Sequence, residues 1–185
     1  MKALRRKLKS RRGFTMAELL MVILILALVG SVVVSGIPAA MNAYRKVVDG
    51  ANAQLLLSTT VSSLRRELSL AKEVKTTGEG KLVSYTNGET GYEITLIHSP
   101  DEEEKYEGIA LAWHTDFKGD QVQLLVTKAA ATKNMISEYD SITYENGVFA
   151  VKGLQVKKDG KILAALDSTT KPLYIRSVMN AEATT

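Results

Sequence analysis

The 185-residue chain contains no cysteine and only two histidines. Without cysteine it can form no disulfide framework, no thiolate metal site and no cysteine nucleophile. Nothing in the sequence places His98 or His114 with a nucleophilic serine or with a third metal ligand. No glycine-rich loop of the phosphate-binding type is present either. These absences lead us to expect no enzyme, no cofactor and no metal site.

Acidic residues are missing from the first 13 positions, which hold seven of the 24 lysines and arginines. The seven are Lys2, Arg5, Arg6, Lys7, Lys9, Arg11 and Arg12. From Phe14 onward the remaining 17 basic residues stand against 20 acidic ones, a net charge of −3. The basic balance of the chain therefore comes from its first residues and gives no reason to expect nucleic-acid binding. The length suits one globular domain with an appendage.

Charged residues are also missing between Glu18 and Arg45. Most of this stretch, Leu19 to Ile37, consists of apolar residues broken only by Gly30, Ser31, Ser35 and Gly36. A helix needs about 20 apolar residues to cross a hydrocarbon core of roughly 30 Å. We therefore expect a membrane-inserted helix, with the basic leader in the cytoplasm and the rest of the chain outside.

Two general explanations fit this N-terminus incompletely. A secretory signal would be cleaved near the small residues that follow the apolar run, but its apolar stretch usually has only about 7–15 residues. These small residues are Ser35, Gly36, Ala39 and Ala40. A plain uncleaved anchor explains the length, but not why the acidic Glu18 stands where the helix enters lipid.

The residues Gly13 to Leu20 read Gly-Phe-Thr-Met-Ala-Glu-Leu-Leu. This stretch resembles the cleavage and methylation signature of type IV prepilins and pseudopilins, in which a basic leader ends in Gly, Phe follows, and Glu is the fifth residue of the mature chain. The resemblance implies that a prepilin peptidase cuts between Gly13 and Phe14 and N-methylates the Phe14 amine, so that the apolar helix is retained. The chain departs from the commonest pattern at Met16-Ala17 and in the late position of Pro38.

Cleavage after Gly13 would create an ammonium group at Phe14, one helical turn from Glu18. Opposite charges within about 4–6 Å offset much of the cost of bringing each into an apolar environment. In this family the glutamate of one subunit is thought to meet the amine of a neighbour, so the resemblance implies an assembly and register role for Glu18. A simpler and compatible role is that Glu18 caps the first helical turn.

We expect the chain to divide into a basic leader (1–13), a hydrophobic transmembrane and assembly helix (14–40), an amphipathic helix (41–76) and a β-rich head domain (77–185). Helical spacing after Pro38 is carried by two apolar series. They are Tyr44, Val48, Ala51 and Leu55, then Leu57, Val61, Leu64, Leu68 and Ala71. The helix is expected to reach about Lys75, either continuously or with a break at Pro38.

From Lys81 onward, short β-rich runs alternate with turn signals. Strands are expected at 82–86, 92–97, 109–114, 121–127, 142–145, 148–152, 154–158, 161–165 and 173–178. Asn146-Gly147 and Asp159-Gly160 should form two-residue hairpin turns, because these pairs accept positive φ. Lys128 to Glu138 is compatible with a short helix or a loop. The pattern predicts an α+β fold, with the second half of a long helix packed on an antiparallel sheet.

The acidic cluster Pro100 to Glu104 could bind Ca²⁺, as some pseudopilins do. It lacks the alternate spacing and the turn glycine of a dedicated Ca²⁺ loop, so a solvated loop is expected.

The resemblance predicts a type IV pilin-like filament subunit. Its partners would be prepilin peptidase, identical or related pilin subunits, membrane lipid before assembly, and inner-membrane assembly machinery. Many major pilins close their C-terminal region with a disulfide, which this chain cannot do. A minor pilin, a pseudopilin of a secretion system such as type II secretion, or a DNA-uptake pilin fits equally well. The alternative is a monomeric single-pass anchor that carries an extracytoplasmic binding domain.

Overall fold

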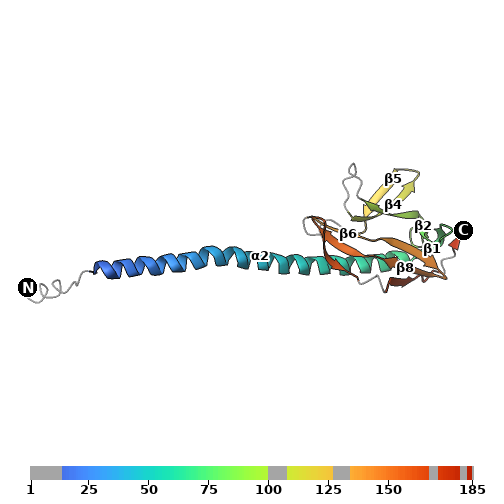
Figure 1. The fold of residues 1–185 in the computed structure, drawn as a ribbon. Coiled ribbons are helices and arrows are strands. Elements are labelled where there is room, and N and C mark those ends of the chain that lie inside the picture. Colours follow the sequence, from blue (N-terminus) through green and yellow to red (C-terminus); the bar gives the residue numbers. More distant parts are fainter. Residues whose placement is uncertain (1–13, 100–107, 127–133, 167–170, 180–182, 185) are drawn as a thin grey trace, which may run out of the picture. The chain divides into compact units, whose positions relative to one another are not determined.

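The computed structural model describes residues 14–99, 108–126, 134–166, 171–179 and 183–184. One long helix is followed by strands (Figure 1). The elements are α2 (Met16–Ser69), β1 (Ala71–Thr76), β2 (Leu82–Asn87), β3 (Glu93–Ser99), β4 (Gly108–Thr115), β5 (Gly119–Leu124), β6 (Met135–Glu138), β7 (Ser141–Glu145), β8 (Val148–Lys152), β9 (Gln155–Lys158), β10 (Lys161–Ala165), β11 (Leu173–Arg176) and β12 (Ala183–Thr184). The chain divides into two units after Val47.

The described residues of the second unit, Val48–Thr185, form three sheets. The largest has the strand order β12-β1-β2-β3-β4-β5, and two smaller sheets have the orders β10-β9-β6 and β11-β8-β7. Every pairing is antiparallel except that of β12 with β1, which is parallel. This arrangement confirms the predicted α+β class, although the strands form several sheets rather than one.

Within the second unit, α2 buries one face in the core that the sheets share. Its buried residues are Ala53, Leu56, Leu57, Thr60, Leu64 and Leu68, spaced three or four apart as one side of a helix requires. Leu64 and Leu68 are fully buried in the same cluster as Phe149 of β8 and Val156 of β9. The packing of α2 on the strands is therefore what closes this core.

The two predicted apolar series had different outcomes. The second series is largely correct, since Leu57, Leu64 and Leu68 are buried. Tyr44 and Leu55 of the first series, for which only helical spacing is predicted, lie outside the core and are 68% and 62% exposed. The face of the helix that carries Tyr44 and Leu55 continues with the polar residues Ser58, Thr59 and Ser62. Because these residues favour solvent, this face is not the one that packs on the sheets.

The helix ends at Ser69, six residues before the predicted end near Lys75, and residues 71–76 form strand β1. Ala71 and Val74 are both fully buried although they are three residues apart. Their common orientation comes from a register shift in β1, with Glu73 at φ 47° between them. A bulge of this kind gives a strand the apolar spacing of a helix, which is why the sequence pattern was misleading.

The buried end of α2 is held by three hydrogen bonds from distant residues. The Ser69 and Leu70 carbonyls accept from the backbone N–H groups of Val178 (2.9 Å) and Gly88 (2.7 Å), and the Ala71 carbonyl accepts from Ser177 Oγ (2.8 Å). These bonds satisfy carbonyls for which the helix itself has no donor. The close approach leaves no room for a side chain at Gly88, where a Cβ would lie 2.8 Å from the Leu70 oxygen.

Close to this end, Glu67 accepts two hydrogen bonds through Oε1. One comes from the Tyr85 hydroxyl (3.1 Å) and the other from Asn87 Nδ2 (2.7 Å). Tyr85 is fully buried and Asn87 is 5% exposed. A single carboxylate oxygen therefore satisfies two buried donors and ties α2 to β2.

Both predicted two-residue hairpins are confirmed. Asn146 and Gly147 have φ values of 50° and 80°, and Asp159 and Gly160 have 49° and 75°. Positive φ at both central positions is the requirement of a type I′ turn. These turns set the pairing of β7 with β8 and of β9 with β10.

Every strand predicted from Leu82 onward has a counterpart, with small differences at the ends. A short helix or a loop was predicted for Lys128 to Glu138. Residues 135–138 form strand β6 instead, so that prediction is wrong for them. Residues 128–133 of that segment lie outside the described residues, as does the acidic cluster 100–104.

Candidate processing and assembly site at the N-terminus

The first turn of α2 is fixed by a reciprocal pair of side chains. Thr15 precedes the helix, and its Oγ1 accepts a hydrogen bond from the Glu18 backbone N–H (3.2 Å). Glu18 Oε2 accepts in return from the Thr15 backbone N–H (2.9 Å) and hydroxyl (3.0 Å). This is a capping box, in which two otherwise unpaired helix donors are satisfied. The helix consequently starts at Met16, two residues after the predicted cleavage point.

The capping role considered for Glu18 is therefore confirmed. All the hydrogen bonds that Glu18 accepts from Thr15 go to Oε2, and Oε1 takes part in none of them. The carboxylate also lies at the positive end of the helix dipole, where negative charge is favoured. Thr15 was not singled out from the sequence, although its spacing from Glu18 is the Thr-x-x-Glu signature of this cap.

Phe14 is the first described residue and is 77% exposed. Gly13, on the other side of the predicted cleavage point, lies outside the described residues. All side chains from Phe14 to Val47 are exposed, and most of those between Leu19 and Ile37 are large and apolar. Such a surface needs lipid or other apolar helices around it.

The two serines of the apolar segment do not contradict membrane insertion. Ser31 Oγ donates to the Leu28 carbonyl (2.7 Å), and Ser35 Oγ donates to the Ser31 carbonyl (2.9 Å). Their hydroxyl groups are satisfied inside the helix, so they cost little in an apolar environment. Pro38 lies inside α2, which continues past it to Ser69.

In the part of the chain that the structure describes, α2 is the one helix long and apolar enough to cross a membrane. It fits an N-terminal membrane anchor.

The other candidate residues do not form a recognisable site in the described regions. His114 Nδ1 lies 2.7 Å from Asp120 Oδ1, and both side chains are mostly exposed. His98 lies in β3. Among the described residues, no three histidines or acids gather in a way that could hold a metal ion.

Residues 8–34 match the family model described as the prokaryotic N-terminal methylation motif. This motif is the type IV prepilin signature, so the chain carries a prepilin-type N-terminus. It implies processing by prepilin peptidase and pilin assembly. No curated protein and no solved structure matches the chain.

Proposed function

We propose that the chain is a type IV pilin-like subunit that is cut after Gly13, methylated at the Phe14 amine and assembled through its N-terminal helix into a pilus or pseudopilus. The observation that carries this proposal is the exposed, mostly apolar surface of residues 14–47, which overlaps the methylation motif matched at residues 8–34. A helix that is apolar all round is stable in lipid or against other apolar helices. A subunit that passes from the membrane into a filament exchanges surrounding lipid for the apolar helices of neighbouring subunits.

The proposal also defines a topology and a set of partners. The basic leader stays in the cytoplasm, where prepilin peptidase removes it, and the second unit lies outside. Membrane lipid surrounds α2 until the inner-membrane assembly machinery adds the subunit to a filament of identical or related chains. The role is structural, and we assign no catalytic residue.

Within a filament, Glu18 is proposed to set the register between neighbouring subunits. Its Oε2 is already engaged by Thr15 of the same chain, whereas Oε1 is left out of the cap. The new ammonium group at Phe14 of a neighbouring subunit is a suitable donor to Oε1. A carboxylate and an ammonium that enter an apolar bundle together offset each other's desolvation.

The processing step is tested by intact-mass analysis and N-terminal sequencing of the protein from its own membrane. We expect a chain that begins with N-methylated Phe14, together with fibres that contain this chain in electron micrographs. An intact leader without fibres would indicate the monomeric anchored binding domain instead. A start between Ile37 and Met41 would indicate a cleaved secretory signal.

The register role is tested by separating the charge of Glu18 from its capping bond. Glutamine also serves in a capping box, so Glu18→Gln keeps the cap but loses the charge. The matched control is Thr15→Ala, which loses the capping hydroxyl but leaves the carboxylate in place. We expect Glu18→Gln and Glu18→Ala to enter filaments poorly and Thr15→Ala to enter at close to the wild-type level. If Glu18→Gln enters filaments at the wild-type level, the register role is refuted.

A further inference from the structure

The turn between β4 and β5 exposes an aromatic side chain almost completely. Phe117 is 99% exposed, with Asp116 and Lys118 on either side. We call residues 116–118 the hairpin tip. A large apolar side chain in this position is costly in water and is typical of an anchor that a partner buries.

The hairpin tip is held in place before any partner binds. The Lys118 backbone N–H donates to Thr115 Oγ1 (3.2 Å), and Gly119 adopts a φ of 66° at the end of the turn. Across the two strands, His114 Nδ1 pairs with Asp120 Oδ1 at 2.7 Å. Because the turn is already ordered, burial of Phe117 costs little additional conformational entropy.

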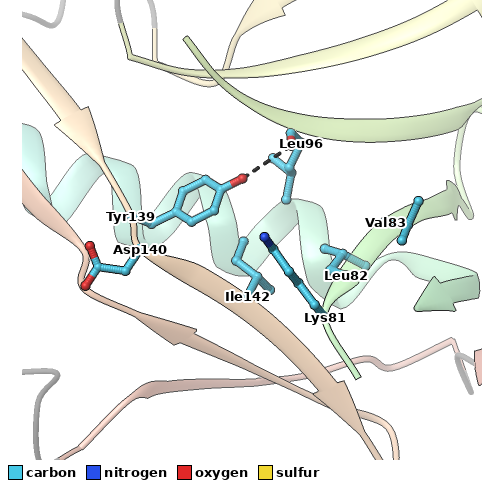
Figure 2. Close-up of a pocket in the computed structure, with 7 residues that line it drawn as sticks. All are labelled: Lys81, Leu82, Val83, Leu96, Tyr139, Asp140 and Ile142. Atoms are coloured by element: carbon cyan, nitrogen blue, oxygen red, sulfur yellow. Dashed lines mark hydrogen bonds between the residues drawn. The ribbon is translucent and has the colours of Figure 1, made fainter. Parts of the chain in front are cut away.

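A pocket of about 250 Å³ lies elsewhere in the second unit, among β2, β3, β7 and the residues that precede β2 and β7 (Figure 2). Its lining residues are Lys81, Leu82, Val83, Leu96, Tyr139, Asp140 and Ile142. The Tyr139 hydroxyl donates to the Leu96 carbonyl (3.2 Å) and fixes one wall. In Figure 2 the Lys81 side chain extends among the apolar residues, while the Asp140 carboxylate points away from them.

The size of the pocket suits one side chain rather than a cofactor. Small-molecule sites usually measure about 300–1,000 Å³, whereas this pocket holds the volume of roughly eight water molecules. Its charges are also complementary to the hairpin tip, because a base lies inside and an acid stands at the rim. A second pocket, of about 280 Å³, is lined by Thr143, Glu145, Asn146, Val148, Ala150 and Tyr174. Its one charged lining residue is an acid and would repel Asp116.

We propose that the hairpin tip of one copy inserts Phe117 into this pocket of a second copy, with Asp116 against Lys81. The inference rests on the proposed function, because a filament brings copies of the chain side by side. It adds a contact between the second units to the contact between the N-terminal helices.

The hairpin tip does not reach the pocket of its own chain. Leu96 pairs with Leu111 in β4, and the strand runs on from there to Thr115 before the turn begins. Four residues of strand span about 13 Å. The two surfaces therefore belong to different parts of the chain, and a contact between them is heterologous. Repetition of such a contact gives a closed ring if the rotation between copies closes, and an open helical assembly, as a filament requires, if it does not.

Cysteine cross-linking tests the contact cleanly because the chain has no native cysteine. The full-length variant Lys118→Cys/Val83→Cys places one thiol beside Phe117 and one at the pocket rim, where Val83 is 47% exposed. Filaments treated with a short bis-maleimide should yield a ladder of products at multiples of the processed chain mass. Each single-cysteine variant should yield nothing larger than a dimer. The control Lys118→Cys/Tyr174→Cys, with the second thiol at the other pocket, should give no ladder.

Two further variants test the chemistry of the contact. Phe117→Ala in the double-cysteine chain should reduce cross-linking about tenfold or more, because a buried aromatic side chain is lost. Lys81→Asp should reduce it up to about fivefold, as expected for an ion pair of a solvent-exposed lysine. Adding Asp116→Lys to Lys81→Asp should restore it.

Several results would overturn the contact. Filaments of the Lys118→Cys/Val83→Cys variant that give no ladder, and show no effect of the charge exchange, would remove the contact and leave the proposed function standing. Products whose mass is not a multiple of this chain would show that the pocket takes a different partner. If the native chain has no methylated Phe14 and forms no filaments, the proposed function fails and this contact fails with it.

Discussion

The bonds that Glu67 accepts from Tyr85 and Asn87 allow a quantitative test of how the second unit is held together. Replacing Glu67 with leucine removes the acceptor of two hydrogen bonds, of 3.1 Å and 2.7 Å, without disturbing the backbone. Glu67→Gln is the matched control, because it keeps an oxygen at the same position and removes only the charge.

The size of the effect follows from the burial of the two donors. Tyr85 is fully buried and Asn87 is 5% exposed, so water cannot replace the lost acceptor. A buried donor without a partner costs about 1–3 kcal/mol, which gives about 2–6 kcal/mol for Glu67→Leu. Glu67→Gln exchanges a charged acceptor for a neutral one and should cost about 1–2 kcal/mol. The larger loss is a substantial part of a typical domain stability of about 5–15 kcal/mol.

The measurement is urea unfolding of the full-length chain in detergent, monitored by tryptophan fluorescence. Trp113 is the only tryptophan, and it packs against the core of the second unit. The free energy of unfolding should fall in the order wild type, Glu67→Gln, Glu67→Leu. If Glu67→Leu is as stable as Glu67→Gln, or if both lie within about 0.5 kcal/mol of wild type, the two bonds do not contribute to the attachment of α2 to β2.

Three further predictions concern the same unit. Burial, followed by the negative charge of Glu67, raises the pKa of Tyr85 above its usual value of 10. Tyr85 therefore ionises in the unfolded chain before it ionises in the folded chain, and stability is lost as the pH rises above 10. Tyr85→Phe should reduce the slope of stability against pH in this range by up to about 1.4 kcal/mol per pH unit. Gly88→Ala places a Cβ 2.8 Å from the Leu70 oxygen and should cost about 1–3 kcal/mol in a denaturant titration, whereas an unchanged midpoint would show that the two segments can separate freely. Asp49→Asn breaks the 2.7 Å ion pair with Lys158 and should cost about 1 kcal/mol or less at low salt, and the difference from wild type should shrink in high salt.

Most of the local structure was predictable from the sequence because it depends on near neighbours. The turn pairs Asn146-Gly147 and Asp159-Gly160 require positive φ, and this requirement alone located two hairpins. The Thr-x-x-Glu spacing at Thr15 and Glu18 likewise predicts the cap, although only the acid was recognised. The N-terminal candidate site was readable for the same reason, since its residues lie within a few positions of one another.

The features that were missed depend on residues far apart in the chain. The end of α2 at Ser69 is set by a donor at Val178, and no local pattern reports such a bond. The spacing of Ala71 and Val74 imitated a helix because a bulge turned both side chains inward. The pocket and its lining required the folded arrangement of β2, β3 and β7, which strand prediction does not provide.

The parallel pairing of β12 with β1 and the bond from Val178 to Ser69 both link the late part of the chain to the point where α2 ends. Translation produces α2 before it produces these residues. The sheet that contains β1 consequently cannot be completed until residues 183–184 have been synthesised. If the chain is the filament subunit proposed above, a copy becomes ready for incorporation only after Val178 and residues 183–184 have joined the fold, so the order of synthesis would keep incomplete copies out of the fibre.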